Sequence, residues 1–320
     1  MSAKEDTTPS SRCASCGIAE NDDIKLKNCT ACYLVRYCSV KCQKEHRSKH
    51  KRACKKRAAE LRDELLFKQP ESTHLGDCPI CTLPLPFDLR NSESLVCCGK
   101  IICMGCFVAN MKREVEMRLQ PSCPFCRKVR PKTKEEMEKQ HMKRLEANDT
   151  VAIFQQGWDQ FKKEDYISAF EYWTKAAELG YVEARYFLAC LYQNGYGVEK
   201  DVGKKIHHLE EAAIAGHPFA RYNLGCEEWG VGNKERAVKH WVIGAAQGEG
   251  DSIKDLMDAF KRGVMAKEDL AASFRAHKAA VDATKSRQRQ AAENMLSTSK
   301  PSQEYVDSIK KLRMHSRRDV

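Results

Sequence analysis

Cysteine placement constrains the fold of this 320-residue chain more than any other feature. Fifteen of the 17 cysteines lie before position 127, in two clusters at residues 13–54 and 78–126. The first twelve residues, MSAKEDTTPSSR, contain no apolar core and no small-residue cleavage site, so we expect no secretory leader and an intracellular protein of the cytoplasm, the nucleus or both. Thiols stay reduced in these compartments, so the clusters predict metal binding rather than disulfides.

The first cluster consists of four residue pairs at metal-binding spacing. Two intervening residues let a tight turn aim both thiolates at one ion, and three place the ligands on adjacent helical turns. The eight candidates, enough for two zinc ions, are Cys13, Cys16, Cys29, Cys32, Cys38, Cys42, His50 and Cys54. Spacing also permits His46 as a ligand, although a solvated helix face is the favoured interpretation for this residue.

Residues 13–54 resemble the MYND zinc finger, including Tyr37 in RYCS and a basic helix that carries the last two ligands. The resemblance implies interleaved pairs, with Cys13, Cys16, Cys38 and Cys42 on one ion and Cys29, Cys32, His50 and Cys54 on the other. It also implies a partner, because such fingers commonly bind a short proline-containing peptide as an added extended segment.

The second cluster again offers eight ligands: Cys78, Cys81, Cys97, Cys98, Cys103, Cys106, Cys123 and Cys126. Their order, with CPIC at one end and CPFCR at the other, resembles a RING finger. Lys100 stands where that family usually has a zinc-binding histidine, so the resemblance is to an all-cysteine variant in which Cys97 and Cys98 are adjacent. Adjacent ligands on one ion require an unusual local backbone.

The RING resemblance implies a cross-brace and a docking surface for a ubiquitin-conjugating enzyme. The cross-brace places Cys78, Cys81, Cys103 and Cys106 on one ion and Cys97, Cys98, Cys123 and Cys126 on the other. The docking residues would be Ile80, Pro124 and Arg127, while the place where many members carry a tryptophan is occupied by Asn110 or Met111. No catalytic residue is expected, because such a ligase positions its partner without covalent chemistry.

The ligand count also changes the electrostatic argument. Fifteen cysteines and His50 provide sixteen ligands, which predicts four Zn²⁺ ions. Fifteen thiolates and four such ions lower the formal net charge from +11 to +4, so general attraction to nucleic acid is not expected. The basic residues between positions 41 and 57 can serve as a nuclear-localisation signal or a phosphate contact, but a solvated helix face is favoured.

After position 150, internal similarity predicts paired helices. The pattern AAxxG, shortened to AAQG in its last copy, ends at Gly180, Gly216 and Gly248. The segment ARYFLACLYQNGYGVEKD resembles the Sel-like subclass of tetratricopeptide-type repeats, whose pattern is filled here by Ala184, Leu188, Tyr192, Gly195, Gly197, Val198 and Asp201. The resemblance implies a solenoid that binds a protein or peptide.

Equivalent positions of these repeats predict packing rather than ligand binding. Small residues recur at Gly157, Ala189 and Gly225, and large ones recur at Trp173, Leu209 and Trp241. The remaining two cysteines, Cys190 and Cys226, share one equivalent position and are expected to be buried small hydrophobes.

The predicted fold class is therefore multidomain: two small zinc-stabilised α+β fingers followed by an all-α helical-repeat solenoid. The expected segments are a disordered N-terminus at 1–12, a MYND-type finger at 13–54, a helix and linker at 55–77, a RING-like finger at 78–127, a helical linker at 128–149, helical repeats at 150–263, a capping helix at 264–297 and a frayed tail at 298–320.

Three functions are compatible with this organisation. The favoured one is a RING-type ubiquitin ligase that recruits partners through the MYND-type finger and the repeats. The alternative is a non-catalytic adaptor or scaffold, and a basic nucleic-acid-binding regulator is a weaker third. With 31% charged residues and a mean hydropathy of −0.61, no membrane association is expected.

Overall fold

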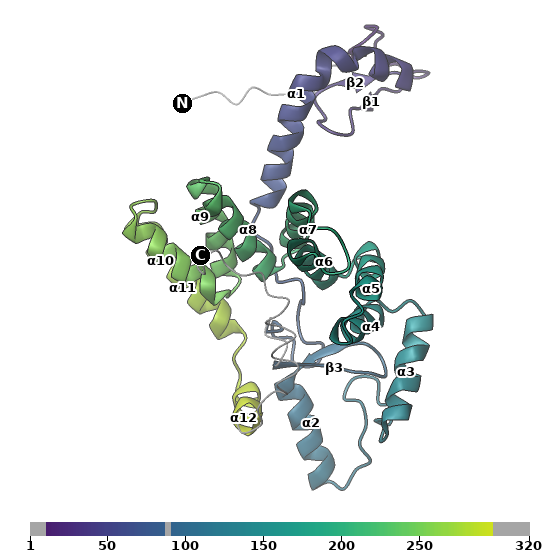
Figure 1. Cartoon of the computed structure of the whole chain (residues 1–320), viewed down its shortest axis with the longest axis vertical. Coiled ribbons are helices and arrows are strands. Elements are labelled where there is room, and N and C mark those ends of the chain that lie inside the picture. Colours follow the sequence, from purple (N-terminus) through teal and green to yellow (C-terminus); the bar gives the residue numbers. More distant parts are fainter. Residues whose placement is uncertain (1–10, 87–90, 297–320) are drawn as a thin grey trace. The chain divides into compact units, whose positions relative to one another are not determined.

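The computed structural model of the chain describes residues 11–86 and 91–296 (Figure 1). It divides into two compact units, one ending at Lys68 and the other beginning at Gln69. The tail expected at 298–320 and most of the N-terminus expected at 1–12 lie outside the described residues. Ser11 and Arg12 are described and belong to the first hairpin, because Ser11 accepts a backbone hydrogen bond from Glu20 and Arg12 pairs with Ala19.

The first unit is a small two-stranded sheet followed by one long helix. Strands β1 (Lys27–Asn28) and β2 (Arg36–Tyr37) are antiparallel, and α1 spans Val40–Leu66. The Ser39 hydroxyl caps α1 by accepting from the Cys42 N–H at 3.2 Å. The helix expected after position 54 is continuous with the helix that carries the last ligands, because no glycine or proline interrupts residues 40–66.

The second unit begins with the second finger. Strands β3 (Ser92–Ser94) and β4 (Ile101–Cys103) are antiparallel, with Glu93 opposite Ile102, and α2 (Met104–Glu116) follows at once. The buried side chains of Leu85, Leu95 and Ile102 pack against the cysteines. Such a core is small, so a finger of this size needs additional stabilisation.

Helices make up the rest of the described second unit. Their bounds are α3 Lys134–Glu146, α4 Thr150–Lys162, α5 Tyr166–Glu178, α6 Val182–Asn194, α7 Val202–Ile214, α8 Pro218–Gly230, α9 Lys234–Ala246, α10 Gly250–Lys261, α11 Lys267–Ala283 and α12 Arg287–Leu296. Helices α4 to α9 form three consecutive pairs, α4 with α5, α6 with α7 and α8 with α9 (Figure 1). Among the described residues, no helix has both the length and the apolar character needed to cross a membrane.

The packing expected for the repeats is confirmed at its large and small positions. Trp173, Leu209 and Trp241 are buried, with 0%, 0% and 3% of their surface exposed. A Cβ at Gly157 or Gly225 would lie 2.5 or 2.3 Å from an indole atom of Trp173 or Trp241, so only glycine permits these helix approaches. Cys190 is fully buried, as expected, whereas Cys226 is half-buried.

The segment expected as one capping helix consists of two helices instead. Helix α11 ends at Ala283, and α12 starts after a break in which the Ser286 hydroxyl accepts from the Arg289 N–H at 3.2 Å. Ser286 therefore caps a new helix in the middle of a sequence that is helical in pattern throughout. Helix α11 packs on α9 and α10, whereas α12 packs on α2 of the second finger (Figure 1).

Candidate metal centres

Four CxxC turns share one backbone geometry. In each, the N–H of the residue after the second cysteine donates to the carbonyl of the first cysteine, at 2.8 to 3.0 Å. That following residue has a positive φ in every turn: Gly17 at 75°, Tyr33 at 57°, Thr82 at 58° and Arg127 at 64°. Three of the four are not glycine, so this strained conformation is a property of the turn rather than of one residue. Such a turn points both sulfur atoms to the same side.

The first unit gathers its eight candidate ligands into two groups. Within each group the ligand atoms all lie within 4.8 Å of one another. One group is Cys13, Cys16, Cys38 and Cys42, and the other is Cys29, Cys32, His50 and Cys54. Cys16 Sγ lies 3.6 Å from Cys38 Sγ, and Cys32 Sγ lies 3.1 Å from His50 Nε2. The sequence pairs are therefore interleaved in space.

The second unit gathers the other eight cysteines in the same manner. The groups are Cys78, Cys81, Cys103 and Cys106, and Cys97, Cys98, Cys123 and Cys126. Cys81 Sγ lies 3.7 Å from Cys103 Sγ, and Cys97 Sγ lies 3.3 Å from Cys126 Sγ. The first sequence pair thus meets the third, and the second meets the fourth.

These groups fit zinc on observations other than their composition. A tetrahedral ion with Zn–S bonds of about 2.3 Å separates its sulfurs by about 3.8 Å, close to the spacings found here. Backbone N–H groups also point at the sulfurs: Cys103 N donates to Cys78 Sγ and Cys106 N to Cys103 Sγ, both at 3.4 Å. Such bonds stabilise thiolates, the form that binds zinc. Bound zinc would cross-link the turns; each group provides four ligands, which leaves no open position for catalysis.

Adjacent Cys97 and Cys98 reach one group because they lie within a tight turn that begins at Leu95 and closes at Gly99. Gly99 has a φ of 70° and donates its N–H to Leu95 O at 2.8 Å. A Cβ on Gly99 would lie 2.4 Å from Arg144 Nη2, so α3 approaches this turn closely. The unusual backbone expected for adjacent ligands is thus a left-handed glycine turn against α3. Lys100, at the place of the usual histidine, points elsewhere and lies over the Phe125 ring at 5.8 Å.

The thiols of one group titrate unequally in the metal-free protein. Burial opposes ionisation of Cys13, but backbone N–H groups outweigh it and lower its pKa to about 6. Hydrogen bonds to Cys16 and Cys42 raise the pKa of Cys38 to about 12. Four sulfurs this close cannot all ionise without a cation, which supports metal binding at this group.

His46, the alternative ligand, lies outside the four-ligand groups. Its Nδ1 is 3.1 Å from the Tyr37 hydroxyl, and its ring stacks against His50 with centroids 5.8 Å apart. Tyr37 is 3% exposed. These contacts assign His46 and Tyr37 to holding the His50 ring in place rather than to metal binding.

The residues expected to dock a conjugating enzyme lie on the two outer CxxC turns of the second finger. Ile80 is 42% exposed, Pro124 is half-buried and Arg127 is exposed. Phe125, which the sequence argument did not single out, is also 42% exposed. Each turn therefore holds one large apolar side chain in solvent on a backbone that hydrogen bonds fix.

A buried glutamate that the sequence did not indicate ties α2 to the last turn. Glu114 Oε1 accepts from Ser122 N and from Asn110 Nδ2, each at 2.8 Å, and its other oxygen pairs with Arg130. Burial raises the pKa of Glu114, but these partners outweigh it and leave the pKa lowered. Asn110, one candidate for the usual tryptophan position, thus has its side-chain amide bonded within the finger.

A second unexpected cluster joins residues 69–77 to the repeats. Glu183 Oε2 lies 2.7 Å from His74 Nε2 and 3.2 Å from His217 Nε2. The composition resembles a metal site, but the two imidazole rings stack with centroids 4.4 Å apart at 15°. In-plane lone pairs of parallel rings cannot converge on one ion. Furthermore, His217 Nδ1 accepts from Ala220 N, so this nitrogen is already engaged and the neutral ring carries its proton on Nε2. The cluster is therefore a polar contact that holds the segment 69–77 against the repeats, and not a metal site.

Family comparisons agree with two of the three regions. Residues 13–54 match the family model for the MYND finger, and residues 152–181, 182–217 and 218–249 match the Sel1 repeat. Both resemblances are therefore confirmed, whereas no family match confirms a RING-type finger at 78–127. No curated protein matches the sequence significantly.

Two solved structures show partial similarity. A Sel1 repeat protein from Oxalobacter formigenes is 17% identical with a TM-score of 0.39, and the alignment covers 65% of this chain and 83% of that one. A protective antigen of uropathogenic Escherichia coli strains, which displays an SLR fold, is 17% identical with a TM-score of 0.38. That alignment covers 55% of this chain and 40% of the antigen. The chain combines a MYND-type finger and Sel1-type repeats around a second cysteine-rich finger.

Proposed function

We propose that this chain is a zinc-stabilised protein-interaction module holding four zinc ions, whose second finger docks a ubiquitin-conjugating enzyme as a RING-type ligase does. The observation that carries this proposal is the pair of exposed apolar side chains, Ile80 and Phe125, on two hydrogen-bonded CxxC turns. Large apolar groups held rigidly in solvent are typical anchors of protein interfaces. Pro124 and Arg127 lie on the second of these turns.

Such a finger accelerates transfer by positioning rather than by covalent chemistry. Ile80 and Pro124 would contact the conjugating enzyme. Arg127 is exposed beside the last ligand and would contact both this enzyme and its bound ubiquitin through the planar, five-donor guanidinium. The substrate lysine would then attack the ubiquitin thioester that the conjugating enzyme carries, with the ubiquitin held in one orientation.

The test is autoubiquitination with a panel of conjugating enzymes, combined with binding and elemental analysis. Ile80→Ala should weaken docking roughly 5- to 100-fold, the range typical of an interface anchor. Arg127→Ala should preserve docking and slow ubiquitin discharge. The matched controls are Leu119→Ala, with an equally exposed apolar side chain at 41%, and Lys128→Ala, an exposed cation next in sequence.

Retained zinc in all four variants separates these effects from unfolding. If no conjugating enzyme supports chain formation, or if both docking variants behave as their controls do, the ligase proposal is wrong. The chain would then be a non-catalytic adaptor. Asn110 favours that alternative, because its amide bonds Glu114 and Ser122 at a place where many RING fingers present a tryptophan.

The MYND-type finger is proposed to take a proline-containing peptide and the repeats a further protein or peptide. Both residues of β1 are exposed, so this strand offers an edge to which an extended peptide can add. Because α1 continues to Leu66, the informative deletion removes residues 1–68, a complete compact unit, instead of ending inside the helix. If partners recovered with the full chain are all recovered without this unit, the finger is not a docking site.

A further inference from the structure

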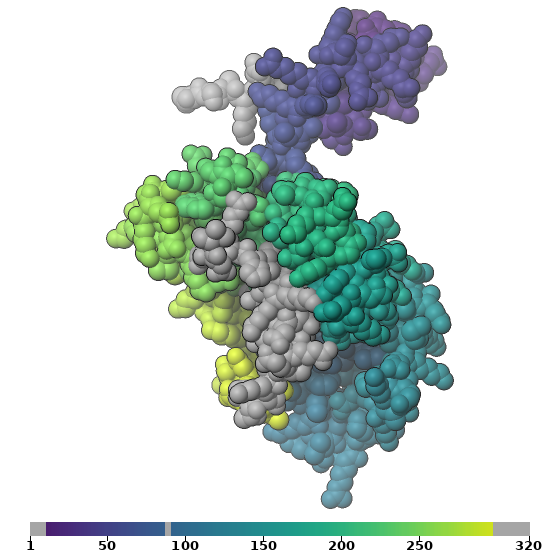
Figure 2. Space-filling view, in the orientation of Figure 1, coloured from purple at the N-terminus to yellow at the C-terminus, as the bar shows by residue number. Residues whose placement is uncertain are grey.

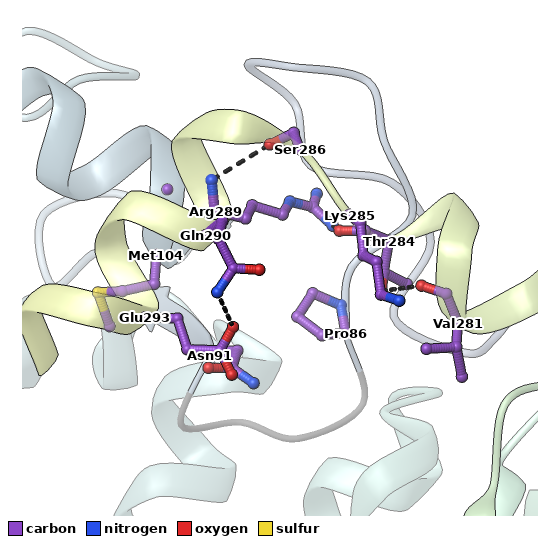
Figure 3. A pocket seen from close by; sticks show the side chains of 11 residues that line it. Pro86, Asn91, Met104, Val281, Thr284, Lys285, Ser286, Arg289, Gln290 and Glu293 are labelled. Carbon is purple, nitrogen blue, oxygen red and sulfur yellow. Dashed lines mark hydrogen bonds between the residues drawn. The ribbon is translucent and has the colours of Figure 1, made fainter. Parts of the chain in front are cut away.

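Arg289 of α12 reaches a CxxC turn more than 200 positions away in the sequence. Its Nη1 donates to Pro84 O and to Thr284 O, both at 2.7 Å. Its Nη2 donates to Leu83 O at 3.2 Å and lies 3.5 Å from Cys81 Sγ. Figure 3 shows this side chain extending from α12 toward Thr284, along a cavity of about 240 Å³. One guanidinium therefore bonds the turn that carries two candidate ligands and the end of α11.

The backbone of α12 is also packed against the finger. A Cβ built on Gly105 would lie 2.8 Å from Arg289 N and 2.9 Å from Arg289 Cα, so α12 rests on the one residue of α2 that lacks a side chain. Ala292, one turn further along α12, is only 1% exposed. The arginine is thus delivered by a closely packed helix rather than by a free chain end.

The charges of the two partners make this contact attractive. A zinc ion with four thiolates has a net charge of −2, which a nearby cation stabilises. Groups that bond the ligands orient them and tune metal affinity, and their removal typically costs 10- to 100-fold in affinity. The atom contacted here is the sulfur of Cys81, and the contacting group is a permanent cation.

We propose that the Arg289 guanidinium holds and stabilises the Cys81 ligand of the zinc site formed by Cys78, Cys81, Cys103 and Cys106, and that retention of this ion and docking of α12 stabilise one another. The inference rests on the zinc binding proposed above, but not on ligase activity. By reciprocity, an ion bound more tightly when α12 is docked must also hold α12 more firmly. Loss of this one ion would release α12 from α2.

Zinc release to a chromogenic chelator tests the proposal in the full chain. Arg289→Gln should release one of four zinc ions roughly 10-fold faster than wild type, with the other three unchanged. Arg289→Lys keeps the positive charge but loses the planar, multi-donor guanidinium, so its zinc release rate should be intermediate. The control is Arg287→Gln, an exposed arginine two residues earlier on the same helix. Ala292→Glu should also speed release, because it displaces α12 although the arginine itself is retained.

Two further measurements fix the mechanism. In protein loaded with Co²⁺, Arg289→Gln should move the sulfur-to-cobalt charge-transfer band to lower energy, because an unpaired thiolate gives up electrons more readily. Amide exchange in residues 287–296 should rise in the same variant and stay unchanged in Arg287→Gln. Equal release rates and spectra for Arg289→Gln and Arg287→Gln, in protein with four zincs, would overturn this inference alone. Wild-type protein without zinc in the second finger would overturn it together with the proposed metal binding.

Discussion

The two fingers use the same CxxC turn but are stabilised in different surroundings. The first belongs to a compact unit that ends at Lys68 and contains one long helix. The second belongs to the same compact unit as the helical repeats, and its surface is continuous with theirs in the space-filling view (Figure 2). A zinc finger too small to build its own core can therefore depend on metal alone or share a core with a larger neighbour.

Polar contacts from four helices of the second unit hold its finger and the segment just before it. His74 bonds Glu183 at the start of α6, Gln155 of α4 bonds Ser94 of β3 at 3.0 Å, and Arg289 bonds the first turn. Arg144 of α3 adds a bond to Val96 O at 3.3 Å. Because these contacts cross between finger and helices, unfolding one side leaves buried polar groups unpaired on the other. We therefore expect the second finger and the repeats to unfold together.

Chelation should produce the largest contrast between the fingers. Each structural zinc site contributes on the order of 10–16 kcal/mol of apparent folding free energy, so removing the ions should unfold residues 11–68 completely. In the second unit, exchange should rise in the finger, in α12 and at the start of α6. Exchange in α9 and α10 should also rise, though less than in the finger, because these helices belong to the same cooperative unit. Peptide-resolved hydrogen exchange with and without chelator measures the change in each unit. Unchanged exchange in α12 would show that the second finger and this helix are not coupled.

Gly99→Ala should strongly destabilise the second finger although it spares every candidate ligand. The added methyl would meet Arg144 at 2.4 Å and Asp149 at 2.7 Å, and Gly99 has a positive φ. Backbone strain and overpacking together should cost about 2–4 kcal/mol in urea unfolding. Gly76→Ala is the control, because Gly76 also has a positive φ but nothing within 4 Å. Equal losses for both would mean that α3 does not press on this turn.

His74→Ala should destabilise the second unit by about 1–3 kcal/mol, because the Glu183 carboxylate loses a partner and the His217 ring loses its stack. Glu71→Ala, an exposed change earlier in the same linker, should have almost no effect. A double-mutant cycle with Glu183→Gln measures the coupling. Additive effects of the two substitutions would show that His74 and Glu183 do not interact energetically.

The smallest expected effect is a pH dependence confined to the repeats. Burial, reinforced by Arg221 and Arg236, lowers the pKa of His240 to about 3 from its usual value of 6.5. The unfolded chain therefore takes up the proton first, and stability falls as pH drops below 6.5. Between pH 7.5 and 6 the loss from this residue should be roughly 1 kcal/mol. His240→Asn should flatten the slope by that amount, and an unchanged slope in urea unfolding at pH 7.5 and 6 would rule out this contribution.

The spacing of residues in the sequence predicted the features that form between residues close to one another along the chain. The CxxC turns depend on residues within one turn, and the repeat glycines pack against tryptophans of the same helix pair, so the sequence pattern specifies them. The contacts of His74 with Glu183 and of Arg289 with Cys81 join residues 109 and 208 positions apart. Nothing in the sequence near any of these residues indicates the partner. The split of the capping segment into α11 and α12 depends on Ser286, one serine among many polar residues.

Equilibrium unfolding followed by two probes tests whether the second finger and the repeats form one cooperative unit. All four tryptophans, at positions 158, 173, 229 and 241, lie in the repeats, so their fluorescence reports that part alone. Zinc released to a chromogenic chelator during the same urea titration reports the fingers. We predict two zinc ions released with the tryptophan transition and two in a separate transition belonging to the first finger. Release of all four ions before the tryptophan signal changes would show that the second finger unfolds independently of the repeats.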